Sequence, residues 1–263
     1  MTDELGARSA PVRRLRRLIQ KRAERDAARA FVVEGPRGVA AAWEADADVR
    51  EVFIGPDHSG ADALAQAWSE RGVSVHRLAP DVIAEVTDTV TPQGVVAVVA
   101  GGAAPIDEAA DLSRVLVLAD VRDPGNAGTI IRTAEAAGAS AVVFCRGSAD
   151  AFSPKVVRAS AGAVFHVPIL QAGDPGEALD VLAQRGVRRI GTAADGGERY
   201  DRFDWTGPTA LVLGNEAWGL PEHLTSSIDA WVTVPMAGRA ESLNVAAAAA
   251  VLLFEATRDR TSS

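Results

Sequence analysis

Three stretches of the chain place polar side chains where an apolar strand would give way to a turn or a helix. They are DPGNAGTIIRTAEAAGA from Asp123, LVLGNEAWGLPEHL from Leu211, and VPMAGRAESLNVAAAAA from Val234. Their candidates for chemistry are Asn126, Arg132, Glu216, Ser242 and Asn244. Groups of these types can orient a substrate, exchange a proton or stabilise developing negative charge.

Each of these residues also has a purely structural interpretation. Asn126 could cap a helix, with Arg132 pointing to water. Glu216 could be a surface acid in a turn, and Ser242 an ordinary N-cap. However, all three stretches have the same strand-to-turn setting, and a hydrophobic core does not require that combination.

The sequence lacks the residue patterns that other familiar kinds of binding or catalytic site require. The loop DPGNAGTI has the wrong glycine spacing for a dinucleotide site, and no G-x-x-x-x-G-K-[ST] phosphate loop occurs. The usual methyltransferase fold has a glycine-rich cofactor loop after its first strand, and this chain lacks such a loop. The four histidines are scattered without ligand spacing, so no metal site is expected. Cys145 ends an apolar run and is interpreted as a buried structural thiol.

The elements around the candidates alternate between strand-like and helix-like segments from Arg114 onward, and the run VFHVPI is one of the predicted strands. Apolar strands separated by helices predict an α/β fold with a parallel sheet covered on both faces. Ligands in such sheets bind at the carboxyl ends of the strands. The loops after Asp120, Ala194, Gly214 and Pro235 are therefore the places where a site is expected.

The first hundred residues predict a smaller α/β unit that ends near Gly101. The stretch GGAAPIDEAADL then breaks the pattern, and we place the domain boundary there, giving residues 1–103 and 104–263. Nine basic side chains lie between Arg8 and Arg29 although the net charge is −8. Such a stripe can bind phosphates or be a solvated helix face. Its candidate nucleic-acid-binding residues are Arg13, Arg14, Arg17 and Arg22.

Bulk properties limit the class of protein. The 263 residues, 48% of them hydrophobic, suffice for two domains with real cores. No apolar run approaches the roughly 20 residues of a membrane span, and the start lacks the apolar core of a signal peptide. A single cysteine excludes an internal disulfide and fits a reducing compartment, so we expect a cytoplasmic protein without a membrane partner.

The three stretches resemble the signature motifs of the SpoU (TrmH) family of RNA ribose 2′-O-methyltransferases in the SPOUT superfamily. The resemblance covers roughly residues 114–258, with the motifs in the family's order and spacing. The connecting RASAGAVFHVP, which contains Arg158, is similar to the family's arginine-containing segment. The first half is similar, more weakly, to the ribosomal-protein-like RNA-binding domain that precedes the catalytic domain in many members.

This resemblance implies S-adenosylmethionine (AdoMet) as methyl donor, a deep trefoil knot in the C-terminal domain, and a homodimer with sites at the subunit interface. It assigns Asn126, Arg132, Glu216, Ser242 and Asn244 to catalysis and Arg158 to RNA binding. By motif position, the cofactor-binding residues would be Thr192, Ala193, Gly214, Val234, Met236 and Leu243.

The expected reaction transfers a methyl group to a ribose 2′-hydroxyl, with 23S ribosomal RNA favoured as substrate by the N-terminal domain. Because a guanidinium stays protonated, we expect Arg132 to bind phosphate and stabilise the alkoxide rather than act as the base. Two alternatives remain open: a tRNA ribose 2′-O-methyltransferase, and a non-catalytic RNA-binding or ribosome-assembly protein with this fold.

Overall fold

The computed structural model describes residues 4–56, 58–80, 82–87 and 93–258. The chain divides into two compact units. The N-terminal unit comprises Met1–Gly102 together with Phe152–Phe165, and the C-terminal unit comprises Ala103–Ala151 and His166–Ser263. The predicted boundary near residue 103 stays a prediction, and the sequence does not predict that Phe152–Phe165 packs with the N-terminal unit.

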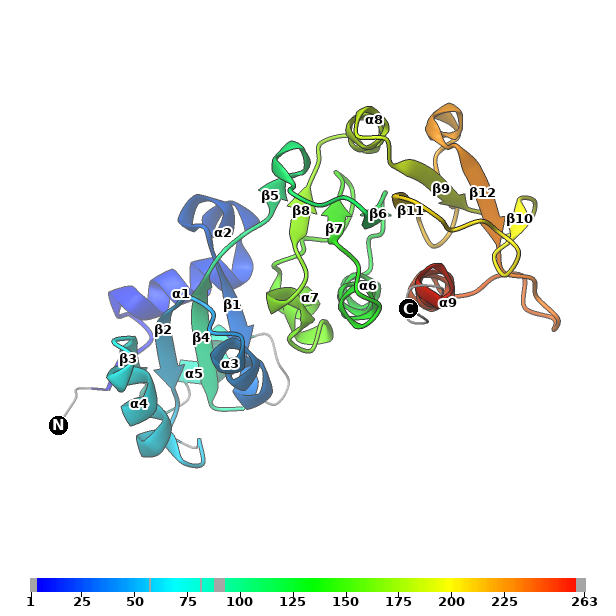
Figure 1. Ribbon diagram of the computed structural model, residues 1–263. Coiled ribbons are helices and arrows are strands. Elements are labelled where there is room, and N and C mark those ends of the chain that lie inside the picture. The colour runs from blue at the N-terminus through cyan, green and yellow to red at the C-terminus, as the bar shows by residue number, and fades with distance from the viewer. Residues whose placement is uncertain (1–3, 57, 81, 88–92, 259–263) are drawn as a thin grey trace. The chain divides into compact units, whose positions relative to one another are not determined.

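The N-terminal unit is a small four-stranded mixed sheet with helices (Figure 1). Strand β4 is antiparallel to both β1 and β2, while β3 runs parallel to β2. Its elements are α1 (Ala10–Gln20), α2 (Arg22–Ala28), β1 (Ala30–Glu34), α3 (Gly35–Glu44), β2 (Val49–Ile54), α4 (Ala61–Glu70), β3 (Ser74–Arg77), α5 (Val82–Val86) and β4 (Val95–Ala100).

Helix α1 shows why this unit forms from its sequence. Val12, Leu15, Leu18 and Ile19 recur at helical spacing and are all buried in the core cluster of the unit. The arginines between them therefore lie on the opposite, more exposed side of the helix. The amphipathic pattern fixes both the helix and the face that meets the sheet.

Segment Phe152–Phe165, with helix α7 (Pro154–Ala159), packs against β1 of the N-terminal unit. Phe31 of β1 lies with its ring centroid 4.8 Å from that of Phe152 and 6.0 Å from that of Phe165. Gly162 has a φ of +95°, and a Cβ there would lie 2.8 Å from the Ala41 side chain. A glycine is needed at this position by both conformation and space.

The C-terminal unit is built on an eight-stranded sheet with the order β10-β12-β9-β11-β6-β7-β8-β5, in which neighbouring strands are parallel. Its strands are β5 (Ala104–Pro105), β6 (Arg114–Leu118), β7 (Ala141–Phe144), β8 (Ile169–Gln171), β9 (Arg188–Thr192), β10 (Glu198–Arg199), β11 (Thr209–Leu213) and β12 (Ala230–Thr233). Its α-helices are α6 (Pro124–Ala136), α8 (Pro175–Gln184) and α9 (Val245–Thr257).

Helices cover both faces of this sheet, with α8 on one side and α6 and α9 on the other (Figure 1). Val115 and Val117 of β6 share a core cluster with Leu179 and Leu182 of α8. Because side chains alternate along a strand, the buried Leu116 faces the opposite side of the sheet. Burial on both faces explains the continuous apolar run RVLVL.

The predicted α/β class and parallel C-terminal sheet are confirmed, whereas one predicted strand and the structural interpretation of Asn126 are wrong. The run VFHVPI was expected to be a strand, but Ala163–Phe165 forms a 3-10 turn and β8 begins only at Ile169. Asn126 does not cap α6; the cap is Asp123, whose side chain accepts a hydrogen bond from the Asn126 amide, with Pro124 in the first turn. The trefoil knot stays a prediction.

Candidate active site

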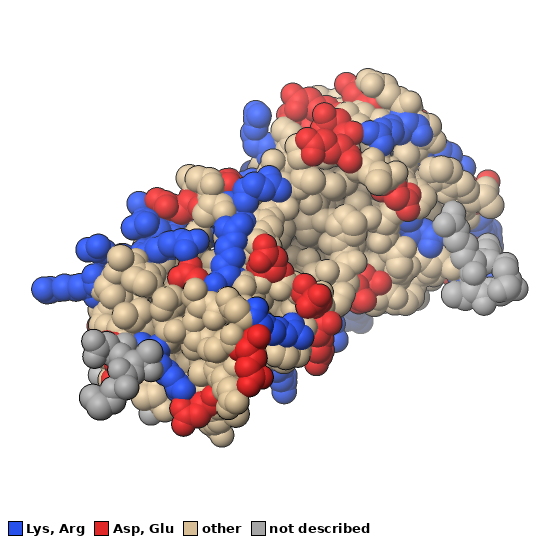
Figure 2. Space-filling model, turned by 60° about the vertical axis from the view of Figure 1, so that its left-hand side comes forward, with Lys and Arg blue, Asp and Glu red and all other residues tan. Residues whose placement is uncertain are grey.

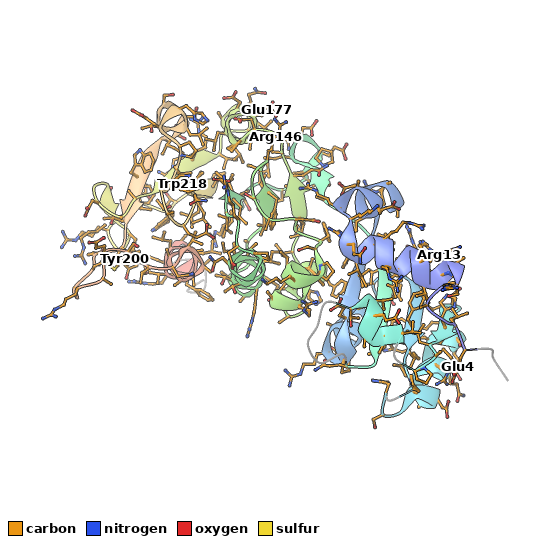
Figure 3. The ribbon with its side chains drawn as sticks, turned by 180° about the vertical axis from the view of Figure 1, so that it is seen from behind. Glu4, Arg13, Arg146, Glu177, Tyr200 and Trp218 are labelled. Atoms are coloured by element: carbon orange, nitrogen blue, oxygen red, sulfur yellow. The ribbon has the colours of Figure 1, made fainter. Side chains whose placement is uncertain are left out.

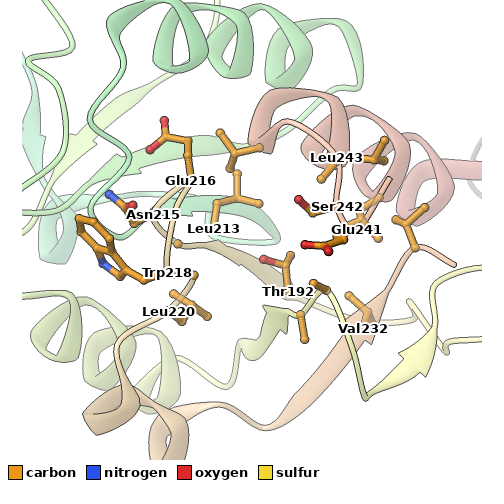
Figure 4. A pocket seen from close by; sticks show the side chains of 18 of the residues that line it. Thr192, Leu213, Asn215, Glu216, Trp218, Leu220, Val232, Glu241, Ser242 and Leu243 are labelled. Carbon is orange, nitrogen blue, oxygen red and sulfur yellow. The ribbon is translucent and has the colours of Figure 1, made fainter. Parts of the chain in front are cut away.

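A cavity of about 440 Å³ lies at the carboxyl ends of β9, β11 and β12 and beside the start of α9 (Figure 4). This volume falls within the range typical of small-molecule sites, roughly 300–1,000 Å³. Its position agrees with the rule that ligands of parallel sheets bind beyond the carboxyl ends of the strands.

The sequence-predicted cofactor residues all line this cavity. They are Thr192, Ala193, Gly214, Val234, Met236 and Leu243. Two of the predicted catalytic residues, Glu216 and Ser242, line it as well. The sheet therefore brings the second and third motifs, which begin at Leu211 and Val234, around one volume; that these side chains bind a cofactor stays a prediction.

Gly214 has a steric reason to be glycine. A Cβ on this residue would lie 2.3 to 2.5 Å from backbone atoms of Gly219 and Leu220. The close approach is maintained by paired backbone hydrogen bonds between Asn215 and Gly219, both of 2.9 Å. This part of the cavity wall is thus a tight loop, and a residue larger than glycine at position 214 would not fit in it.

Asn126 links the first motif to the other two. Its Nδ2 donates to Glu216 Oε1 at 2.9 Å, and its Oδ1 accepts from Asn244 Nδ2 at 2.9 Å. Asn244 is also the N-cap of α9, because its Oδ1 accepts from the amides of Ala246 and Ala247. Three of the five predicted catalytic side chains therefore form one hydrogen-bonded chain at the edge of the cavity.

Arg132 is not brought to this cavity. It lies on α6, is exposed, and does not line the pocket. At 100° per residue, the six-residue separation from Asn126 places the two side chains on different sides of the helix. Within the described residues Arg132 has neither a hydrogen bond nor an ion pair, so its charge is available to another molecule.

The charge of the cavity wall is negative. Glu216 and Glu241 are among the described residues that line it, and none of those residues is a lysine or arginine. Coulomb attraction therefore favours a cationic ligand over one carrying phosphates. Thr192, Ser242 and the loop backbone add hydrogen-bonding groups, while Trp231, Val232 and Leu252 provide apolar surface.

Sequence reasoning missed four residues beside the cavity. Buried Asn215 donates from Nδ2 to the Asp120 carbonyl oxygen at 3.0 Å, which ties the β11 loop to the β6 loop. Asp120 accepts a 2.7 Å hydrogen bond from Arg122, whose guanidinium carbon lies 5.1 Å from the ring centroid of Trp218. Asn215 and Trp218 lie within the second motif, whereas the sequence signal for Asp120 and Arg122 was only their position in a loop that follows a strand.

The predicted RNA-binding arginines of the N-terminal unit differ in their surroundings. Arg14 pairs with Glu51, Arg17 with Glu24 at 3.3 Å, and Arg22 with Asp26 at 3.5 Å. Figure 2 accordingly shows basic and acidic side chains intermixed on the face in view. Arg13 is exposed on α1 and has no ion pair with any described residue (Figure 3). The stripe is therefore partly neutralised by its own neighbours.

Arg158, also predicted to bind RNA, lies on α7 and forms an ion pair with Glu34 at the end of β1. The Glu34 side chain is only 4% exposed, while that of Arg158 is 31% exposed. The pair lies within the N-terminal unit and helps to fix α7 on β1. Part of the charge of Arg158 is thus used for packing.

Other chemistries find no site in the described part of the chain. No group of three or more His, Cys, Asp or Glu residues is arranged there to hold a metal ion. None of the helices in that part combines the length and apolar character needed to cross a bilayer. Cys145 is buried, and burial, with a smaller effect of Asp174, raises the pKa of its thiol to about 12. Such a thiol is not a nucleophile at neutral pH.

The fold and site define an α/β protein with a small-molecule cavity at the carboxyl end of a parallel sheet, preceded by a second small unit. Known proteins share both parts. Residues 113–254 match the model of the SpoU rRNA methylase family, and residues 10–97 match the MRM3-like substrate binding domain. The chain belongs to the SpoU rRNA methylase family, so the family expected from the three motifs is confirmed.

Relatives match along most of the chain. The 23S rRNA (guanosine(2553)-2′-O)-methyltransferase RlmP of Bacillus subtilis is 37% identical, over 88% of this chain and 90% of its own length. The 23S rRNA (uridine(2479)-2′-O)-methyltransferase of Streptomyces viridochromogenes is 35% identical over 97% and 92%.

Solved structures of methyltransferases are also similar to this chain along almost its whole length. The crystal structure of the SpoU methyltransferase AviRb from S. viridochromogenes with the cofactor AdoMet superposes with a TM-score of 0.85 and 33% identity, covering 97% of this chain and 100% of that chain. An AdoMet-bound rRNA methyltransferase from Sinorhizobium meliloti gives a TM-score of 0.84 and 33% identity, covering 98% of each chain.

Proposed function

We propose that this chain transfers a methyl group from AdoMet to a ribose 2′-hydroxyl of 23S ribosomal RNA. The observation that carries the proposal is the cavity, around which the loops of the second and third motifs meet while Asn126 joins them to the first. Two relatives matched along most of this chain are named for this reaction on 23S rRNA.

The cavity suits AdoMet by its chemistry. Two similar structures are described as AdoMet-bound. In this chain, the carboxylates of Glu216 and Glu241 and the absence of Lys or Arg among the described lining residues favour a positively charged donor. The apolar side chains of Trp231 and Leu252 suit the uncharged parts of such a molecule. Thr192, Ala193, Gly214, Val234, Met236 and Leu243 would hold it.

When bound, AdoMet supplies an activated methyl group on a sulfonium. The chain must place the ribose oxygen in line with that group and stabilise the charge that develops on the oxygen. The hydrogen bonds of Asn126 to Glu216 and Asn244 hold the three loops in register at the edge of the cavity. Arg132, which is cationic and forms no ion pair with any residue that the structure describes, would bind the phosphate beside the target and stabilise the alkoxide.

Ribosomal RNA is favoured over transfer RNA by the extent of the matches. The rRNA methyltransferase of S. meliloti matches 98% of this chain, including the N-terminal unit. A solved structure whose description concerns the 2-OH methylation of C/U34 on tRNA matches only 57% of this chain. The match covers 97% of that chain, with a TM-score of 0.52. The N-terminal unit, which matches a substrate-binding domain, would therefore recognise ribosomal RNA.

We propose that the working form is a homodimer in the cytoplasm. Arg132 lies away from the cavity of its own chain, and Phe254 of α9 is 51% exposed in the C-terminal unit. A second copy would cover this apolar surface and bring an arginine to each cavity. Sedimentation velocity of the purified protein tests the dimer, and cell fractionation tests the location.

Calorimetric titration with AdoMet tests the proposed function at its cavity. Gly214→Ala should abolish or strongly weaken binding, because its methyl group would collide with the Gly219 backbone. Gly238→Ala is the matched control from the third motif, since a Cβ there meets nothing within 4 Å. No AdoMet binding by the folded wild type would instead favour a non-catalytic RNA-binding protein.

A further inference from the structure

The rim of the cavity carries an exposed tryptophan. Three large apolar side chains are exposed among the described residues: Trp218 at 60%, Phe254 at 51% and Leu243 at 39%. Of the two that line the cavity, Trp218 presents the larger surface (Figure 4). Tryptophan combines a large apolar ring with a polar N–H and is enriched at interfaces, so an exposed indole at the mouth of a cavity is suited to contact a partner.

The loop that carries Trp218 is held in one conformation. Asn215 and Gly219 exchange backbone hydrogen bonds of 2.9 Å, and Asn215 Oδ1 accepts a further 2.9 Å bond from the amide of Ala217. Asn215 also donates to the carbonyl oxygen of Asp120. The indole is therefore presented with little conformational freedom left to lose, which lowers the cost of binding through it.

Arg122 stands beside the indole and is itself fixed. Its guanidinium carbon lies 5.1 Å from the ring centroid, within cation–π range. Its Nε donates to Asp120 Oδ1 at 2.7 Å, while 60% of its side chain stays exposed. Asp120 has a φ of +70°, and a Cβ on Gly147 would lie 2.8 Å from its carboxylate oxygen. Several residues thus maintain one exposed cation next to one exposed aromatic face.

We propose that Trp218 and Arg122 form a stacking platform for a nucleobase of the RNA next to the methylated nucleotide. The indole would stack on the base, and the guanidinium would contact a neighbouring phosphate. The proposal rests on the proposed function, since it places RNA at the mouth of the methyl-transfer cavity.

The charges favour RNA over the other possible occupants. A cationic donor is attracted to the carboxylates inside the cavity and repelled by Arg122 at its rim. An apolar surface of a second copy would have to bury the guanidinium. A polyanion with aromatic bases matches both members of the platform.

The test compares substitutions at the platform with matched controls elsewhere in the C-terminal unit. Trp218→Ala should weaken binding of a 23S rRNA transcript and raise its KM about tenfold, because one stacked base is lost. Trp218→Phe should retain most of the affinity, and the affinity for AdoMet should stay within about twofold in both variants. Arg122→Gln should weaken RNA binding and flatten its salt dependence. Arg199→Gln, another exposed arginine paired with an aspartate two residues away, should change neither.

Tryptophan fluorescence provides an independent readout. RNA should quench part of the emission of the wild type, and Trp218→Phe should remove that quenching. Trp205→Phe, which changes a half-buried indole bonded to the Tyr200 carbonyl oxygen, should retain it.

Three results would overturn the platform: unchanged RNA affinity in Trp218→Ala, a loss of AdoMet affinity instead, or a shift of the monomer–dimer equilibrium instead. If the wild type methylates RNA and Trp218→Ala does so with the same KM, only the platform fails. If the wild type neither binds AdoMet nor methylates RNA, the proposed function fails and the platform with it.

Discussion

Asn126 in the first turn of α6 accepts a hydrogen bond from Asn244, the N-cap of α9, with 2.9 Å between Oδ1 and Nδ2. The two residues are 118 positions apart in the chain. Through the second bond of Asn126, to Glu216, the starts of two helices and the loop after β11 depend on one another. A change at any of the three should therefore affect the geometry of the cavity edge.

Asn244 allows the two roles of its side chain to be separated. Asn244→Asp keeps the oxygen that caps α9 but cannot donate to Asn126, so turnover should fall about a hundredfold with little change in melting temperature. Asn244→Ala loses both roles and should also lower the free energy of unfolding by about 1 kcal/mol. Methylation assays and thermal denaturation measure the two effects. Full activity of Asn244→Asp would show that the bond to Asn126 is dispensable.

Arg132 is predicted to act in the cavity of the partner subunit. Arg132→Ala and Asn244→Ala homodimers should each lose about 10²–10³-fold in activity while staying folded. A tagged heterodimer of these two single variants should recover about half of the wild-type activity, because one of its sites would hold both intact residues. A heterodimer of wild type with the double variant should be nearly inactive. The reverse pattern would mean that both residues of a site come from one chain.

The ion pair of Arg158 with Glu34 is predicted to stabilise the N-terminal unit. Arg158→Ala removes a charged hydrogen bond to a carboxylate that is 4% exposed, so the free energy of unfolding should fall by about 2 kcal/mol. Lys155→Ala, on an exposed position of the same helix, should change it by less than about 0.5 kcal/mol. Equal urea midpoints for the two variants would contradict the structural role. Arg158→Lys keeps a positive charge at this position, so its RNA affinity measures how much of RNA binding depends on that charge.

Acid stability should depend on Asp229, which joins the start of β12 to β9. Hydrogen bonds and charge from Arg189 hold the pKa of this carboxyl below its usual value of 3.8. A lowered pKa in the folded state stabilises the fold above pH 3.8, and this contribution disappears as the pH falls below that value. Between about pH 4 and 2 the melting temperature of the wild type should fall more steeply than that of Asp229→Asn. Asp195→Asn, an exposed carboxyl without an ion pair among the described residues, should follow the wild type.

The strands of the C-terminal sheet could be predicted because a strand that is buried on both faces appears in the sequence as a continuous apolar run. The run RVLVL is β6 and TALVL is β11, each buried along its whole length. Because neighbouring strands in this sheet are parallel, the loops that follow them lie at the same edge of the sheet. The cavity residues Gly214 and Leu243 follow from that geometry together with the motifs.

Contacts between distant residues could not be predicted in the same way. Nothing near Arg158 in sequence indicates that Glu34, 124 residues earlier, would pair with it. The bonds of Asn126 depend on how α6 and α9 pack, which local propensity does not determine. The cap at Asp123, in contrast, was recognisable, because an aspartate before Pro124 is a strong helix-start signal.

Mapping of 2′-O-methylated nucleotides in 23S rRNA tests the central claim most directly. RNA from cells that lack this chain should lose one ribose methylation, which the wild type restores and the Arg132→Ala variant does not. The purified protein should add the same methyl group to an unmodified transcript when AdoMet is supplied. An unchanged methylation map in cells lacking the chain, together with no transfer by the purified protein, would contradict the account.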